Sequence, residues 1–180
     1  MLTGHLVTLR LVSEKDLDGL WAAHTNIVSR GRFYPLSVQS ESTFRREFAD
    51  NGFWQREEGT LLIVTPDGET AGHIEFFKPV VYWDAFELAY QLYDERHAGQ
   101  GYITEAAQLL VDYLFGAKKQ HRIQLVIVPG NAASRRVAEK CGFTLEGTVR
   151  GAFFNEGSNQ DVLLYGLLRT DPRPWHKDSP

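Results

Sequence analysis

The stretch DERHAGQGYITEA, residues 94–106, holds the residues of this chain that are best suited to bind an anion. Two glycines stand at the start of a run with helical periodicity, directly after an Arg-His pair. Glycines permit a tight turn, amides at a helix N-terminus lack partners within the helix, and the helix dipole adds partial positive charge. The spacing predicts a phosphate or pyrophosphate cradle made of Arg96, His97, Ala98, Gly99, Gln100, Gly101 and Tyr102.

Two common phosphate-binding sequences do not fit this loop. A P-loop ends in Gly-Lys-Ser/Thr, whereas Tyr102 and Ile103 follow the second glycine here. A dinucleotide fingerprint places a third glycine three residues later, where this chain has Thr104. The anion is therefore expected to belong to another kind of ligand.

Acid-base chemistry could come from the strand that precedes the loop. Alternation along FELAYQL places Glu87, Ala89 and Gln91 on one face of the strand. A carboxylate in so apolar a strand is costly to bury without a partner or a purpose, so Glu87 is either a general base or a paired structural glutamate. Glu75 is a second candidate base, and His73 shares its strand face, where a hydrogen-bonded structural histidine is the alternative.

Metal and nucleophilic chemistry have little support in the sequence. The six histidines are scattered, and neither a His-x-x-x-His nor a Cys-x-x-Cys spacing occurs, so no metal site is predicted. A Gly-x-Ser-x-Gly elbow is absent as well. Cys141 precedes Gly142 on an apolar stripe and is expected to be a packed core thiol.

The first half of the chain predicts one strand, two helices and three further strands. HLVTLRLV alternates apolar and polar residues, and Ser13 stands where a helix N-cap is expected. Residues 26–40 follow no period, and PDGE at 66–69 has the residues of a tight turn. The expected elements are strand 5–12, helix 14–25, a helix from Ser42 through 58, and strands 60–65, 71–80 and 83–93, the last three being antiparallel neighbours.

The second half alternates helices and strands. RIQLVIV is too continuously apolar to alternate, which predicts a strand covered on both faces. Asn131 is placed to cap the next helix and Gly142 to close it. The expected elements are helix 101–117, strand 122–128, helix 132–140, and strands 143–154 and 160–168 joined by NEGSN. The order β-α-α-β-β-β-α-β-α-β-β predicts a mixed α/β fold with a mostly antiparallel sheet flanked by helices.

Four segments together resemble the GNAT superfamily of acyl-CoA-dependent N-acyltransferases. Arg96-x-x-Gly99-x-Gly101 matches the family signature (Gln/Arg)-x-x-Gly-x-(Gly/Ala), and FELAYQLY resembles the strand before it. GNAASRRVAEKCGF resembles the second conserved segment, and EGTVRGAFFNEGSNQDVLLYGLLRTD looks like the ending of the RimJ/RimL-like branch, which contains ribosomal-protein N-terminal acetyltransferases. The resemblance implies a single acyltransferase domain over residues 1–170, followed by a tail at 171–180.

The resemblance also implies roles for particular residues. Acetyl-CoA would lay its pyrophosphate on the glycine loop, and Gln91, Leu92 and Tyr93 would offer backbone groups to the pantetheine where the central strands separate. Asn131 would hold the pantetheine arm or cap its helix. Arg135 and Arg136 would meet the cofactor phosphate or form a solvated face.

The catalytic assignment departs from the family pattern at two positions. Glu87 matches a general-base glutamate of some members, but Ala138 replaces the usual acid tyrosine and Val126 replaces a glutamate of the fifth strand. In RimJ/RimL-like enzymes the serine that matches Ser134 is a proposed hydrogen-bond partner of the sulfur; the alternative for Ser134 is a helix-start serine that satisfies backbone groups. The acid-base assignment stays open at this point.

Composition limits the classes of partner. The chain of 180 residues is 43% hydrophobic and 23% charged, which is typical of one soluble globular domain. A net charge of −4 argues against nucleic acid, and no apolar run is long enough for a membrane span. One cysteine and the lack of a secretory signal favour the cytoplasm. Composition leaves a monomer and a homodimer equally open.

The predicted activity is transfer of an acetyl group from acetyl-CoA to a primary amine by direct attack. A protein N-terminus is the favoured acceptor, a small amine is the rival acceptor, and a non-catalytic acyl-CoA sensor is the rival from another class. The expected walls of the acceptor site are residues 29–37, the second helix with Phe53 and Trp54, and residues 151–160. Arg30 and Arg32 are expected to attract an acidic acceptor or the cofactor, although the acidic chain as a whole favours a cationic amine.

Overall fold

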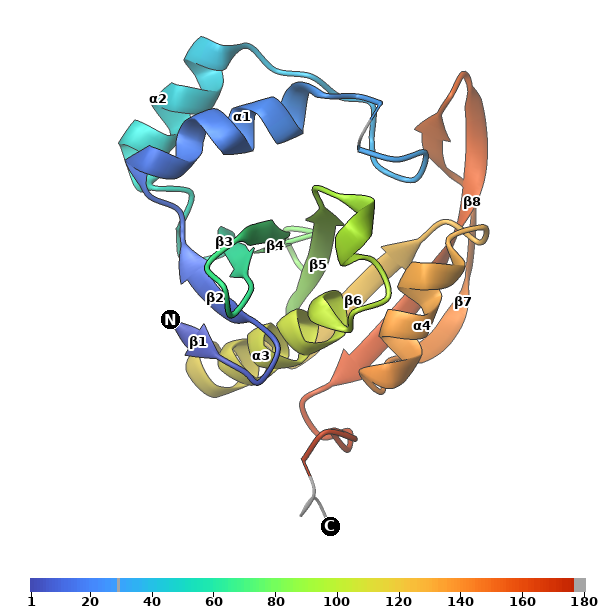
Figure 1. Cartoon of the computed structure of the whole chain (residues 1–180). Helices are drawn as coiled ribbons and strands as arrows, with labels where there is room; N and C mark the ends of the chain where they lie inside the picture. Colours follow the sequence, from blue (N-terminus) through green and yellow to red (C-terminus); the bar gives the residue numbers. More distant parts are fainter. Residues whose placement is uncertain (29, 177–180) are drawn as a thin grey trace.

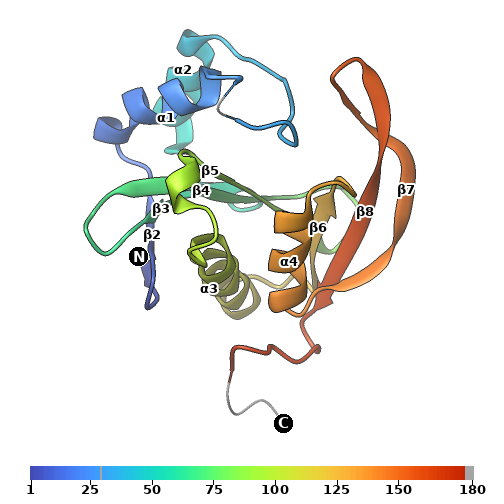
Figure 2. The ribbon, with the colours of Figure 1, turned by 45° about the vertical axis from the view of Figure 1, so that its right-hand side comes forward.

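A computed structural model describes residues 1–28 and 30–176 of the chain (Figure 1). One mixed sheet carries helices on both faces, with α1 and α2 on one side and α3 and α4 on the other (Figure 2). The helices are α1 (Leu17–Thr25), α2 (Glu41–Asn51), α3 (Tyr102–Ala117) and α4 (Ala132–Lys140), with short 3-10 turns η1 (Glu14–Asp16) and η2 (Glu95–His97). The strands are β1 (Leu2–Thr3), β2 (Thr8–Leu11), β3 (Gly59–Val64), β4 (Thr70–Phe77), β5 (Ala85–Leu92), β6 (Arg122–Ile127), β7 (Thr144–Asn155) and β8 (Ser158–Leu168).

The sheet order is β1-β2-β3-β4-β5-β6-β8-β7, and β5 and β6 form its parallel pair. That pair is short, because it runs only from Ala85 opposite Arg122 to Glu87 opposite Gln124. On its other edge β6 pairs with β8 along its whole length, while β5 continues beside β4 as far as Leu92 opposite Gly72. The C-terminal half of β5 therefore borders a split in the sheet.

Apolar side chains fill both faces of the sheet. The larger cluster lies under α3 and α4, where Leu110 and Leu114 of α3 meet Phe86 of β5 and Ile123 of β6. A smaller cluster lies under α1 and α2 and contains Val12, Leu17, Phe44 and Leu62. Each face of the sheet thus packs against its own pair of helices through its own hydrophobic cluster. The split in the sheet therefore lies between two helical layers.

The mixed α/β prediction is confirmed, with one extra strand and an altered N-terminus. Residues 5–12 do not form one strand, because a turn separates β1 from β2. The Glu105 carboxylate on α3 accepts hydrogen bonds from the amides of His5, Leu6 and Val7 at 2.9, 2.7 and 2.7 Å. A partner 98 residues away thus takes the amides that a strand ladder would have used.

Two boundaries and the burial of one strand also differ from the sequence prediction. Helix α2 is capped by Ser40 and ends at Asn51 rather than at 58, because Gly52 adopts a left-handed conformation with φ of 65°. The last hairpin turns within two residues, 156–157, instead of five. Val126 is 41% exposed, so β6 is not covered on both faces at that position.

The C-terminal residues 171–176 form neither helix nor strand but pack against α3. The Asp112 carboxylate accepts hydrogen bonds from Arg173 and from the Trp175 indole, both at 2.8 Å. Trp175 also contacts the larger core cluster. The described part of the tail is therefore attached to the domain.

Candidate active site

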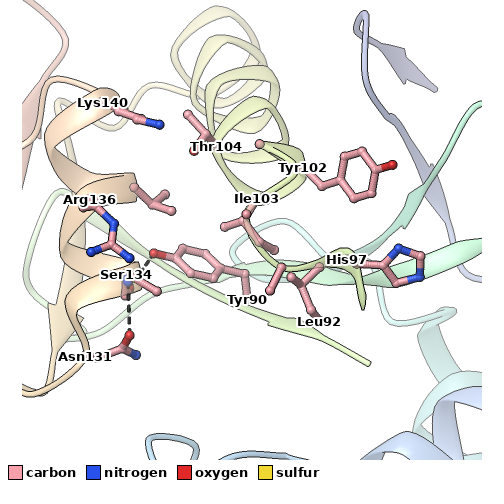
Figure 3. A pocket seen from close by; sticks show the side chains of 15 residues that line it. Tyr90, Leu92, His97, Tyr102, Ile103, Thr104, Asn131, Ser134, Arg136 and Lys140 are labelled. Atoms are coloured by element: carbon pink, nitrogen blue, oxygen red, sulfur yellow. Dashed lines mark hydrogen bonds between the residues drawn. The ribbon is translucent and has the colours of Figure 1, made fainter. Parts of the chain in front are cut away.

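A cavity of about 280 Å³ opens between the N-terminal end of α3 and one side of α4 (Figure 3). We call it the α3–α4 cavity. Backbone and side chains of three segments form it: the end of β5, the glycine loop with the start of α3, and α4. Its lining residues are Tyr90, Leu92, His97, Ala98, Gly99, Gly101, Tyr102, Ile103, Thr104, Asn131, Ala133, Ser134, Arg136, Val137 and Lys140.

The glycine loop has the backbone that an anion cradle needs. Gly99 and Gly101 have φ of 75° and 85°, a backbone conformation that residues other than glycine rarely adopt. A Cβ atom placed on Gly99 would meet nothing within 4 Å, so the loop faces open space. Gly101 occupies the N-cap of α3, and no side chain caps this helix. The amides of the first turn of α3 are therefore available to a ligand.

Charged residues of the loop have partners of their own. The Arg96 guanidinium forms ion pairs with Glu69 and with Asp94, the latter at 3.2 Å, and its side chain does not line the cavity. His97 is buried, and its Nε2 atom lies 3.7 Å from the Glu69 carboxylate. Gln100 is also outside the lining. The cavity thus uses the backbone of the loop more than its side chains.

Helix α4 forms the opposite wall. Asn131 caps it, because its Oδ1 atom accepts a hydrogen bond from the Ser134 amide at 3.1 Å. The Ser134 hydroxyl lies 2.6 Å from the Tyr90 hydroxyl, which reaches across from β5 (Figure 3). Tyr90 was not among the predicted site residues. The signal that could have found it is a hydroxyl on a strand face otherwise made of Phe86, Leu88 and Leu92.

A second, more open cavity of about 680 Å³ lies beyond the end of β5, and we call it the loop cavity. The predicted pantetheine contacts Gln91, Leu92 and Tyr93 line it, together with residues of the segment between α1 and α2. It shares Tyr90, Leu92, Ala98 and Asn131 with the α3–α4 cavity. The two cavities therefore meet where β6 leaves β5.

The other face of the sheet carries a cleft under α1 and α2, with a volume of about 190 Å³, which we call the acid-lined cleft. It shares Tyr34 and Tyr93 with the loop cavity. Its lining residues are Leu20, His24, Tyr34, Gln39, Phe44, Glu47, Phe53, Thr60, His73, Glu75 and Tyr93. The loop cavity thus neighbours both the α3–α4 cavity and the acid-lined cleft on the opposite face of the sheet.

Two titratable groups of the acid-lined cleft are strongly perturbed. Burial, with a smaller contribution from Glu58, raises the pKa of Glu75 to about 7. Burial lowers the pKa of His73 to about 4, and its Nδ1 atom lies 2.9 Å from the Tyr93 hydroxyl. Glu75 is consequently able to exchange a proton near neutral pH, whereas His73 stays neutral there.

The comparisons with known proteins agree with this arrangement. Residues 7–144 match the family described as "Acetyltransferase (GNAT) domain". This chain belongs to the GNAT acetyltransferases. It is 30% identical to YdaF of Bacillus subtilis (strain 168), a provisionally named ribosomal N-acetyltransferase, over 94% of this chain and 93% of that protein. It is 32% identical to the ribosomal-protein-serine acetyltransferase of Escherichia coli (strain K12), over 75% of each chain.

Solved GNAT structures have the same fold. RimJ of Mycobacterium smegmatis, in complex with CoA-disulfide, superposes with a TM-score of 0.74 at 22% identity, covering 93% of this chain and 85% of that one. Family membership and the N-acetyltransferase relatives confirm the predicted activity: the protein is an N-acetyltransferase that transfers an acetyl group to an amine. The sensor alternative loses its support.

Within this GNAT domain the predicted base Glu87 has a structural partner. Its carboxylate accepts a hydrogen bond from Gln124 Nε2 at 2.8 Å, while burial raises its pKa. Glu87 lines none of the three cavities described above, whereas Glu75 lines the acid-lined cleft. The role of Glu87 stays a prediction, and Glu75 is the better placed carboxylate.

Arg30 organises the segment between α1 and α2. It is buried, and its guanidinium donates hydrogen bonds to the carbonyl oxygens of His24, Ser37 and Pro35, the first two at 3.0 and 2.8 Å. It also lies over the Tyr34 ring, 4.7 Å from the centroid. Arg30 lines the loop cavity as well, so its attraction of an acidic acceptor or the cofactor stays a prediction beside this structural role.

The expected acceptor walls are only partly right. Phe53 lines the acid-lined cleft, but Trp54 packs in the core against Phe76, with 5.3 Å between the ring centroids. The 151–160 hairpin lines none of the three cavities and instead supports the loop, through a 2.9 Å hydrogen bond from Asn155 Nδ2 to the Arg32 carbonyl. Of the predicted wall at 29–37, residue 29 lies outside the described residues.

The remaining expectations concern sulfur, metals and membranes. Cys141 is fully buried, its thiol donates to the Thr104 carbonyl at 3.6 Å, and burial raises its pKa to about 12, as expected for a core thiol. Residues 1–28 and 30–176 contain no cluster of three potential metal ligands. No helix within the same ranges has the length and hydrophobicity that crossing a bilayer requires.

Proposed function

We propose that this GNAT enzyme takes its acetyl group from acetyl-CoA bound in the α3–α4 cavity and transfers it to the α-amine of a protein N-terminus. The observation that carries the proposal is the meeting of the cavities at the end of β5. The glycine loop lies on one side of the sheet and the acid-lined cleft on the other. A thioester and an amine can thus approach the same point from opposite faces.

The chain's own residues fit the cosubstrate. The loop backbone at Gly99 and Gly101 and the uncapped start of α3 would hold the pyrophosphate. Arg136 and Lys140 line the same cavity and add positive charge. Backbone groups of Gln91, Leu92 and Tyr93 would pair with the pantetheine amides along the split, and Asn131 borders that path. When bound, acetyl-CoA supplies the activated acyl group.

Glu75 would act as the general base. An α-amine has a pKa of about 8 and a lysine about 10.4, so a group with a pKa of about 7 is suited to the α-amine. Ala89 lies directly opposite Glu75 on β5, and its methyl group leaves room over the strand that borders the split. The side chain is thus next to the path that an amine would follow. Glu87 remains the alternative base.

The acceptor would be cationic with an apolar neighbour. Glu47 and Glu75 line the acid-lined cleft, Glu58 lies close enough to influence Glu75, and Phe44 and Phe53 form its apolar wall. Acidic groups of this kind attract ammonium groups and raise their local concentration. YdaF and the E. coli relative, named for ribosomal substrates, favour a protein N-terminus. The same charge would suit a polyamine such as spermine, with which a spermidine N-acetyltransferase of Vibrio cholerae has been crystallised together with CoA.

The test is to titrate the purified protein with acetyl-CoA in a calorimeter and to follow thiol release against peptides with free N-termini, acetyl-blocked peptides with an internal lysine, and polyamines. We expect saturable binding and release that requires a free N-terminus. Release with polyamines alone would reassign the acceptor. Binding without release from any amine would revive the sensor alternative, and no binding would overturn the proposal.

A further inference from the structure

The hydroxyl groups of Tyr90 and Ser134 form a pair at the split between β5 and β6. They come from elements 44 residues apart and lie 2.6 Å from each other. Tyr90 lies three residues beyond Glu87, the last β5 residue that pairs with β6, so its ring crosses the opening to reach α4 (Figure 3). Both residues line the α3–α4 cavity.

Packing alone does not explain the Tyr90 hydroxyl. The same strand face carries Phe86, Leu88 and Leu92, and phenylalanine would fill the position of Tyr90 equally well. Burying a hydroxyl removes its hydrogen bonds to water, which costs free energy unless a polar partner in the protein replaces them. The structure gives Tyr90 that partner in Ser134.

Helix capping does not explain the Ser134 hydroxyl either. Asn131 is the N-cap of α4, and its side chain already accepts the hydrogen bond from the Ser134 amide at 3.1 Å. The alternative role that the sequence left open for Ser134, satisfying the helix start, is therefore taken by Asn131. The Ser134 hydroxyl is left with Tyr90 and with the cavity.

We propose that Tyr90 is a positioning residue of the acetyl transfer: it donates its hydrogen bond to Ser134 Oγ and so directs the Ser134 hydrogen toward the leaving sulfur. The inference rests on the proposed function. The amine nitrogen bonds to the acetyl carbon, the carbon–sulfur bond breaks, and its electron pair stays on sulfur, where the Ser134 O–H donates to it. The base takes the amine proton, and bulk water protonates the thiolate.

The environment of Tyr90 suits a fixed donor and not a proton source. Burial raises its pKa far above the usual range, so the phenol keeps its proton at any pH at which the enzyme works. A preorganised donor costs no reorganisation when charge develops on the sulfur. The pair would also supply a hydrogen bond to the sulfur in a chain where Ala138 replaces the tyrosine of α4.

The experiment compares Tyr90→Phe, Ser134→Ala and the double variant in steady-state assays with saturating acceptor. We expect kcat to fall about tenfold in each single variant, as for the loss of one hydrogen bond, while the KM for acetyl-CoA changes by less than about twofold. The double variant should lose little more than Ser134→Ala alone, since the two hydroxyls act as a unit. Tyr113→Phe is the matched control, because Tyr113 packs on the core side of α3.

Three results would overturn the inference. Wild-type kcat in Tyr90→Phe would show that the phenol does not contribute. Additive losses in the double variant would show that the two hydroxyls act independently. Losses that follow acetyl-CoA affinity and the melting temperature would show a structural role only. Absence of transfer by the wild-type enzyme would instead reject the proposed function, and that outcome is distinguishable because it needs no variant.

Discussion

The α3–α4 cavity and the acid-lined cleft are built on different principles. The cavity takes its main features from the backbone: two glycines with positive φ and the uncapped start of α3. The cleft takes its features from side chains of α1, α2, β3 and β4 and of the loop between the helices. Backbone amides recognise a phosphate whatever lies around it, whereas buried carboxylates recognise a particular amine.

The electrostatics of the two sites differ in the same way. In the cavity the amides that start α3 have no side-chain cap, and the Tyr90 and Ser134 hydroxyls pair with each other. In the cleft, Glu75 lacks a hydrogen-bond partner among the described residues, and its pKa is raised to about 7. Two glycines with positive φ, Gly99 and Gly101, therefore lie on the cofactor side, and the carboxyl group with a raised pKa, Glu75, lies on the acceptor side. Substitutions on each side test that division.

The largest effect is expected from the backbone side. Gly99→Val should weaken acetyl-CoA binding by about 100-fold or more, because a side chain would project into the cavity from a residue with a φ of 75°. Calorimetry measures the change, and Gly116→Val, at an open helical position, is the control for a new valine. Retained affinity in Gly99→Val would show that the loop does not cradle the pyrophosphate.

On the acceptor side, Glu75→Gln should lower kcat by about 100-fold at pH 7, the usual scale for loss of a general base. The rise of kcat/KM with pH, which we expect near 7 in the wild type, should disappear in the variant. Glu87→Gln serves as the comparison and should have a smaller effect on turnover, with acetyl-CoA affinity nearly unchanged in both variants. The opposite ranking would assign the base to Glu87.

Glu75 should also set a pH dependence of stability. Its pKa is raised from 4.5 to about 7 in the folded state, so the folded state binds more protons and loses stability as pH rises through that window. Glu75→Gln should therefore increase the free energy of unfolding at pH 8.5, on the order of 2 kcal/mol, and have almost no effect at pH 4. Denaturant titrations check this, with the exposed Glu47→Gln as control. A pH-independent difference would contradict it.

The smallest effect concerns the ion pair between Glu69 and Arg96. The side chains are 38% and 60% exposed, and the pair holds the arginine away from the cavity lining. Glu69→Gln should free Arg96 for the pyrophosphate and tighten acetyl-CoA binding by no more than about threefold, with the gain fading at high salt. Calorimetry at two salt concentrations measures it. Weaker binding would mean that Glu69 supports the loop instead of competing with the ligand.

The sequence predicted those helix ends that depend on a capping residue or a glycine close by in the chain. The α4 cap at Asn131 and the glycine turn before α3 follow from residue types within four positions. The contacts that the sequence did not predict join residues that are distant in the sequence, or residues of one irregular loop. Glu105 takes the amides of residues 5–7, and Arg30 holds the carbonyls of its own loop, neither of which a local pattern can reveal.

The sequence by itself determined the cofactor side of this protein, because a positive φ at Gly99 and Gly101 and a helix cap at Asn131 depend mainly on the residues themselves. Alternation along β5 could say that Glu87 and Tyr90 lie on opposite faces, but not which face would hold a cavity. Only the tertiary structure decided that Glu75 borders the acceptor cleft and that Tyr90 meets Ser134. The physical reason is that β5 pairs with β6 only as far as Glu87 and then continues beside β4 alone, and strand pairing between segments this far apart in the sequence is set by the whole sheet.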